Sequence, residues 1–141
     1  MQIPGHLAVA LLQERLLLPN EAKASTLALL LIASLFPDVV DKSIGYIFRV
    51  MPNGRHYSHN VFSLLLVSGV VTLLGGQRAG YAWFIGHLGH LVADYGSPMP
   101  WFFPLKRYPF KQGHLKFNLA RIRHEALALS LVLLVRWLLT R

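Results

Sequence analysis

Apolar residues recur along the chain in stretches that are too short for a simple membrane span. Four stretches, at 22–36, 61–76, 79–93 and 126–140, hold about 15 residues each, whereas a straight crossing of the hydrocarbon core takes about 20. Short apolar helices can sit in a locally thinned bilayer or be partly immersed. The pattern therefore favours a membrane-embedded helical protein, with a very apolar soluble bundle as the alternative.

The order of apolar stretches and turns predicts about five helices. The first covers residues 3–18, where leucines recur every three or four positions, and the second ends near Phe36 because Pro37 lacks the amide hydrogen that continues a helix. Residues 38–60 are a connector, and the third helix begins near His59. Only residues 75–79 separate the third helix from the fourth, so these two are antiparallel neighbours, and the fifth begins at 121–125. We expect an all-α, up-and-down, membrane-embedded bundle forming a single domain over residues 1–141.

Composition narrows the chemistry that is open to this chain. Hydrophobic residues make up 54% and charged residues 14%, against about 25% charged in a soluble domain. The chain has no cysteine, so any metal must be held by histidine, aspartate or glutamate. Glu14 and Arg15 interrupt the first apolar segment, so a cleaved signal peptide is not expected.

The predicted topology brings almost all histidines and aspartates to one end of the bundle. The starts of helices one, three and five lie at the same end as the finishes of helices two and four. That end holds His6, Asp38, Asp41, His56, His59, His87, His90, Asp94, His124 and Glu125. His87, His90 and Asp94 are spaced i, i+3 and i+7 and therefore share one helical face. Imidazole and carboxylate ligands suit zinc, and also manganese or iron, so we expect a site for one or two divalent ions.

Some of these residues also have an ordinary structural explanation. His87, nearest to the bilayer interior, can be a hydrogen-bonded core group or can orient a ligand. Asp38 can cap a helix or close the turn after the proline, although ionisable groups near membrane depth are costly and usually functional. Asp41 can instead pair with Lys42.

The remaining candidates are weaker. His56 can pair with Arg55, and Glu125 is explained by the preference for acids in the first turn of a helix. His124 and His114 are expected to be solvated at the membrane interface rather than bound to metal.

Basic residues are concentrated at the same end as the histidines. Nine of the 14 lie in its connectors: Lys42, Arg49, Arg55, Lys106, Arg107, Lys111, Lys116, Arg121 and Arg123. By the positive-inside tendency, the site end faces the cytoplasm. The same rim would attract an anionic head group or phosphate, although membrane topology alone can also explain it. Nucleic-acid binding through the net charge of +8 is not expected, because no compact basic module is present.

Five sequence segments together resemble a known family. They are GHLAV around His6, FPDVVD around Asp38, RHYSHN around His59, GHLGHLVADY ending near Asp94, and WFFPL. In order and spacing, over residues 4 to about 105, they resemble the inner-membrane family of metal-dependent hydrolases that is also labelled LexA-binding. The chain departs from that pattern in having Asn60 where serine commonly follows the histidine. It also departs in the wider spacing of its two acids in PDVVD. A looser similarity connects it to zinc-dependent phospholipase C.

The resemblance implies a membrane-bound hydrolase that cleaves a phosphoester bond in a lipid or other amphiphile with a metal-activated water. It implicates His6, Asp38, Asp41, Arg55, His59, His90 and Asp94. Asp41 or Asp38 would accept the proton of the water, and Arg55, with Lys42, would hold the phosphate charge. The alternative is a non-enzymatic metal-binding membrane protein that serves as a scaffold or sensor.

Overall fold

The computed structural model describes residues 1–18, 23–114 and 117–139, and these contain helices and no β-strand. The helices are α1 (Ile3–Leu17), α2 (Ala24–Lys42), α3 (Val61–Ala93) and α4 (Leu119–Leu139). A π-helical turn, η1 (Ser43–Ile47), continues α2. The predicted all-α class is confirmed. The predicted count of about five is not, since the described residues hold four α-helices.

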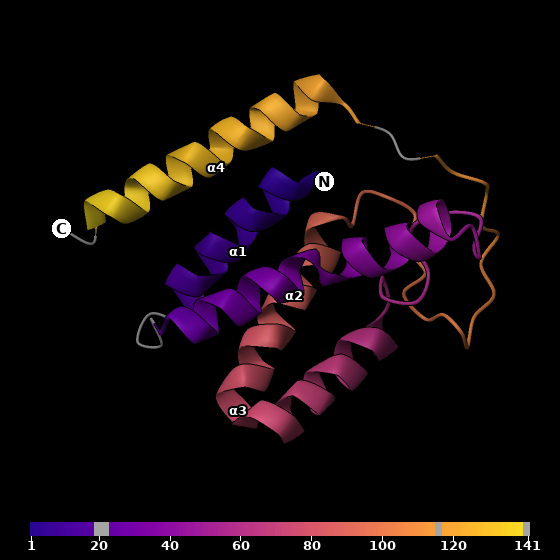
Figure 1. The fold of residues 1–141 in the computed structure, drawn as a ribbon, viewed down its shortest axis with the longest axis horizontal. Coiled ribbons are helices and arrows are strands. Elements are labelled where there is room, and N and C mark those ends of the chain that lie inside the picture. Colours follow the sequence, from indigo (N-terminus) through magenta and orange to yellow (C-terminus); the bar gives the residue numbers. More distant parts are fainter. Residues whose placement is uncertain (19–22, 115–116, 140–141) are drawn as a thin grey trace.

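The difference arises in α3, which contains both the third and the fourth predicted helices. Gly76 interrupts α3 with φ 81° and ψ 172°, a conformation that glycine reaches without the steric cost of a Cβ. The two arms of α3 fold back from this residue and run side by side (Figure 1). The expected antiparallel pair is therefore present, joined by one bent residue rather than by a loop.

A second prediction was wrong, because α2 does not end before Pro37. The helix continues through the proline to Lys42, and Asp38 and Asp41 therefore lie on its last turns rather than in a connector. A proline inside a helix removes one backbone hydrogen bond and displaces the carbonyl groups of the preceding turn. Two groups from other elements bond to carbonyls here: His90 Nδ1 lies 2.7 Å from the Ser34 oxygen, and Ser58 Oγ donates to the Pro37 oxygen at 3.0 Å.

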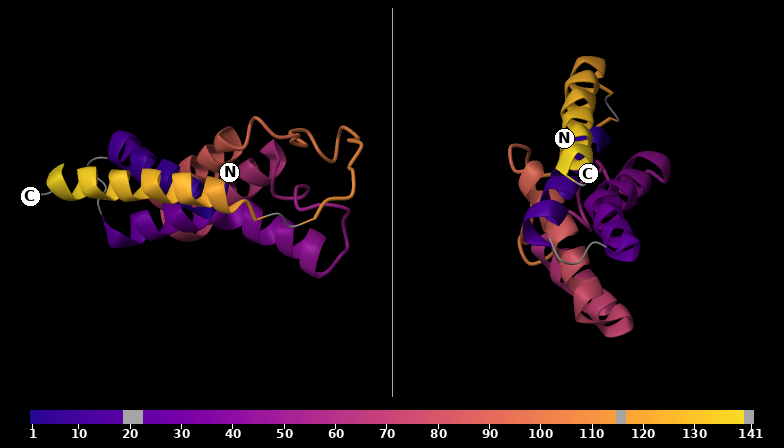
Figure 2. Two further views of the ribbon diagram at one scale, coloured as in Figure 1. Left: turned by 90° about the horizontal axis from the view of Figure 1, so that it is seen from above. Right: turned by 90° about the vertical axis from the view of Figure 1, so that its left-hand side faces the viewer.

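The helices pack in layers, with α4 on the outside (Figure 2). Glu125, near the start of α4, accepts hydrogen bonds from the backbone N–H groups of Gln2 and Gly5 at the start of α1. Near the other end, Arg136 of α4 pairs with Glu14 of α1. These two contacts make α4 parallel to α1, and α4 has no buried residue.

The second arm of α3 approaches α2 very closely. A Cβ on Gly86 would lie 2.4 Å from the carbonyl oxygen of Leu30 and 3.0 Å from the Ala33 side chain. This contact joins a small apolar core formed by Ala10, Leu18, Leu30, Ala82 and Ile85. The close packing fixes the height of α3 relative to α2, and thereby the positions of the polar side chains at their ends.

Within the described parts of the chain, two segments are long and apolar enough to cross a membrane, Ala24–Ile47 and Val61–Ala93. The second bends at Gly76, so each of its arms is about half that length. Large side chains near the bend point outward, with Leu73 87% and Leu74 85% exposed. An apolar surface of this kind suits contact with lipid rather than with water.

Candidate metal centre

Four buried side chains from three parts of the chain converge on one point. Asp38 comes from α2, His59 from the connector before α3, and His90 and Asp94 from the end of α3. One ligand atom from each lies within 4.8 Å of the corresponding atom of every other. The group therefore has the size and the donor atoms of a metal site.

The hydrogen bonds around the two imidazoles determine which nitrogen of each ring faces the centre. His90 Nδ1 lies 2.7 Å from the Ser34 carbonyl oxygen, and His59 Nδ1 lies 2.7 Å from Asp41 Oδ2. Since both partners are acceptors, each Nδ1 carries the hydrogen, and in the neutral ring Nε2 carries a lone pair.

These two lone pairs face each other. The Nε2 atoms of His59 and His90 are 3.2 Å apart, and Asp38 Oδ1 lies 3.5 Å and 3.9 Å from them. Three acceptors at such distances repel one another unless a cation or a proton lies among them. The pKa of His59 accordingly rises, because Asp38 and Asp41 together outweigh the opposing effect of burial. The geometry thus favours a positive charge at this point.

His6 extends the group from the side of α1. Its ring stacks on that of His90 with centroids 3.9 Å apart, and its Nε2 lies 3.6 Å from Asp94 Oδ1 and 4.0 Å from Asp38 Oδ2. Neither of its ring nitrogens has a hydrogen-bond partner, and burial lowers its pKa to about 4. A buried, neutral imidazole without partners can serve as a further metal ligand.

Asp41 holds the connector that carries His59. Its carboxylate accepts hydrogen bonds from the backbone N–H groups of His56, Tyr57, Ser58 and His59, at 2.6–3.2 Å, as well as from the ring of His59. Both oxygens are therefore engaged with residues 56–59. The side chain orients a candidate ligand in the way that carboxylates often orient histidines at metal sites.

Two cations pair with the carboxylates of the centre. Lys42, one turn after Asp38 on α2, contacts Asp38 Oδ2. Arg55 contacts Asp94 Oδ2. The side chain of Lys42 is 32% exposed and that of Arg55 is 25% exposed, so both also reach the surface. The backbone nitrogen of Met1 contacts the other oxygen of Asp94.

Four other predicted residues form no hydrogen bond or ion pair with the converging side chains. His87 is fully buried, and its Nε2 lies 2.9 Å from the Ser58 carbonyl oxygen, so it supports the connector. His56 is buried against Phe110, with ring centroids 3.8 Å apart, and has no hydrogen-bond partner for either ring nitrogen. His124 is exposed on α4, and Glu125 binds the start of α1. His114, expected to be solvated, is also exposed.

Sequence reasoning missed three residues that build the centre. Ser34 supplies the carbonyl that fixes the tautomer of His90, and Ser58 bonds the Pro37 carbonyl. Asn60 accepts the N–H of Ser63 and thereby caps α3, while its amide donates to two carbonyls of the connector. Only Asn60 carried a readable signal, since asparagine directly before a helix is a preferred cap.

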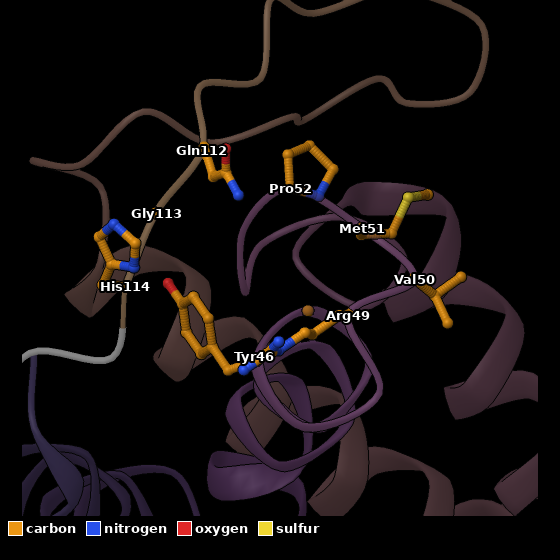
Figure 3. Close-up of a pocket in the computed structure, with 9 residues that line it drawn as sticks. Tyr46, Arg49, Val50, Met51, Pro52, Gln112, Gly113 and His114 are labelled. Atoms are coloured by element: carbon orange, nitrogen blue, oxygen red, sulfur yellow. The ribbon is translucent and has the colours of Figure 1, made fainter.

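A large cavity lies away from this centre. It has a volume of about 660 Å³ and is lined by residues 45–46, 49–52 and 112–114, which include none of the four converging side chains. Figure 3 shows the Tyr46 hydroxyl directed toward His114, while Val50 and Met51 point away.

The fold and the centre define a helical membrane protein with a buried cluster of histidine and aspartate that could hold a metal ion. The chain belongs to the YdjM inner membrane protein family, whose model matches residues 1–141. The resemblance found in the sequence segments is thereby confirmed. Comparisons with curated proteins and with solved structures gave no match.

Proposed function

We propose that this protein is a membrane-bound, metal-dependent hydrolase that cleaves a phosphoester bond in a lipid or another amphiphile. The observation that carries the proposal is the convergence of two imidazole lone pairs and two carboxylates, with both tautomers fixed by bonds to Ser34 and Asp41. Burying these lone pairs and carboxylates side by side costs free energy unless a cation lies between them.

The proposed ligands are Asp38, His59, His90 and Asp94, with His6 beside them. Nitrogen and oxygen donors without thiolate suit zinc, and also manganese or iron. A bound divalent ion would polarise a phosphoryl oxygen and lower the pKa of water at the site.

The charges of the neighbouring side chains suit an anionic substrate. Asp38, Asp41 and Asp94 carry three negative charges, against three positive charges on Lys42, Arg55 and the ammonium group of Met1. A divalent cation would give the centre a surplus of two positive charges. Lys42 and Arg55 would then hold phosphate oxygens instead of carboxylates, with Arg55 able to do so through two N–H groups.

The proton of the attacking water needs a nearby acceptor. We assign this role to Oδ2 of Asp38, because Oδ1 faces the two imidazoles, whereas Oδ2 is contacted by Lys42 and would be released when Lys42 holds a phosphate oxygen. Asp41, the other carboxylate expected for this role, has both oxygens engaged with the connector, and we propose that it positions His59.

We further propose that the protein crosses the inner membrane more than once, with the metal centre toward the cytoplasm. The excess of basic residues in the connectors beside the centre supports this orientation. A scaffold or sensor that binds metal without catalysis is the remaining alternative, and turnover distinguishes it from the hydrolase.

The test is elemental analysis of the detergent-purified full chain, followed by hydrolysis of phosphatidic acid in mixed micelles. His90→Ala and Asp94→Asn should each lose bound metal and turnover together. His124→Ala, which changes an exposed histidine outside the centre, should retain both. Metal bound at the wild-type level in both centre variants would overturn the ligand assignment. Metal without turnover on any phosphoester would leave the scaffold or sensor.

A further inference from the structure

The metal centre opens sideways, through a gap between α1 and α2. A cavity of about 110 Å³ is lined by Ile3, Leu35, Asp38, Val39 and Lys42. Asp38 is one of the converging ligands, so this cavity borders the centre directly. Its other walls are three aliphatic side chains and one ammonium group. The opening thus has a polar inner end and an apolar rim.

The rim faces outward within a candidate membrane span. Val39 is 62% exposed and Ile3 is 55% exposed, and Val39 lies in the Ala24–Ile47 segment. Ile32, which is 55% exposed, Leu35 and Val39 are spaced i, i+3 and i+7, so they share one face of α2. This face forms an apolar track about 10 Å long, at 1.5 Å of rise per residue, that leads to the opening.

We infer that the track and the opening admit one chain of an anionic lipid directly from the bilayer, with its phosphate at the ammonium group of Lys42. This inference rests on the proposed function, because it names the substrate class of the same centre and the side from which the substrate arrives. The apolar chain lies along Ile32, Leu35 and Val39, whereas the head group meets the partly exposed ammonium of Lys42. Ile3 and Val39 on the rim act as specificity-determining residues.

Two physical arguments favour a lipid over a soluble phosphate ester. A hydrated ester would have to cross an aliphatic rim at membrane depth without partners for its polar atoms, which is costly. A lipid keeps its chain in apolar surroundings throughout, and only its head group moves toward the centre. The cation beside the opening selects a negatively charged head group.

The experiment is photocrosslinking of the full chain in phosphatidylcholine vesicles. The vesicles contain a small fraction of phosphatidic acid that carries a diazirine near its head group. Peptide mapping should find the label concentrated at Ile3, Leu35 or Val39. Val39→Trp, which fills the opening, should reduce labelling there by about tenfold, the effect expected for roughly 1.4 kcal/mol of lost binding. Val92→Trp is the matched control, since Val92 is 61% exposed on α3 and borders neither the track nor the opening.

Bound metal is measured on the same samples, and it also checks that each variant is folded. Concentrated labelling that excess phosphatidic acid removes supports the inference. Uniform labelling of exposed apolar residues on α2 and α3 overturns it, because that is the pattern of surrounding lipid. Labelling that Val39→Trp leaves unchanged also overturns it. If labelling is uniform and metal is bound, this inference alone is refuted. If labelling is concentrated but no metal is bound, the proposed function is refuted, and the inference that lipid enters along the track stands.

Discussion

Replacing Asp41 with asparagine tests whether this carboxylate holds the connector or takes part in proton transfer. Oδ1 accepts the N–H groups of Tyr57 and Ser58 at 3.1 Å and 3.0 Å, and Oδ2 accepts those of His56 and His59 together with the His59 ring. Asparagine keeps one acceptor oxygen and places an NH₂ group where the other was. At least two buried N–H groups then lose a charged acceptor.

The expected effect of Asp41→Asn follows from the number of bonds lost. Hydrogen bonds to charged groups contribute about 1.5–3 kcal/mol each, so two of them predict a loss of about 3–6 kcal/mol in the free energy of unfolding. Metal affinity should fall roughly 10- to 100-fold as His59 loses its orientation. Thermal unfolding in detergent measures the first quantity, and competition with a chelator measures the second.

Asn53→Ala serves as the control for this experiment. Asn53 lies in the same connector, but its bonds to Arg55 and Lys111 are partly or fully exposed, so a cost of about 1 kcal/mol or less is expected. If Asp41→Asn unfolds and binds metal like the wild type but loses turnover, the positioning role is wrong. Asp41 would then be the proton acceptor.

Three further predictions concern the packing of α3 on α2, the docking of α4 on α1, and the effect of pH on metal affinity. Gly86→Ala should destabilise the protein by about 1–3 kcal/mol in thermal unfolding, because its Cβ would meet a backbone carbonyl, whereas Gly69→Ala, with nothing within 4 Å, should be neutral or stabilising. Equal effects of the two would contradict the close packing of α3 on α2. Glu125→Gln should cost about 0.5–2 kcal/mol and expose α4 to proteolysis, since the carboxylate caps α1; unchanged cleavage would contradict that contact. Metal affinity should rise as the pH increases above 6.5, because His59, whose pKa is raised above that ordinary value, loses its proton there, while His6, with a pKa of about 4, is already neutral. Titration calorimetry in two buffers measures the protons released, and the absence of release would contradict the role of His59.

Much of the convergence could be predicted because short connections leave few ways to arrange helices. Residues 75–79 are too few for anything but a reversal, so the start of α3 and the end of α3 had to lie together. This reasoning predicts that His59 lies beside His90 and Asp94. It needed only the apolar pattern and the positions of the turns.

The remaining details depend on contacts between distant residues and could not be read locally. Pro37 was expected to end α2, and by local rules that was reasonable. The helix nevertheless continues to Lys42, and Ser58 and His90, from other elements, bond to the carbonyls of Pro37 and Ser34. Likewise, the sequence predicts that Glu125 stabilises the first turn of its own helix. Its carboxylate instead accepts hydrogen bonds at the start of α1, a contact that no spacing in the sequence indicates.

The reversal at Gly76 also has a consequence for how the protein is made. A helical segment that turns back on itself delivers both of its ends to the same leaflet, whichever way it is inserted. The two chain segments that flank α3, one carrying His59 and the other following Asp94, therefore need never be separated by the bilayer during synthesis. Three of the four converging side chains, His59, His90 and Asp94, are brought together by a hairpin whose tip leads the way into the lipid.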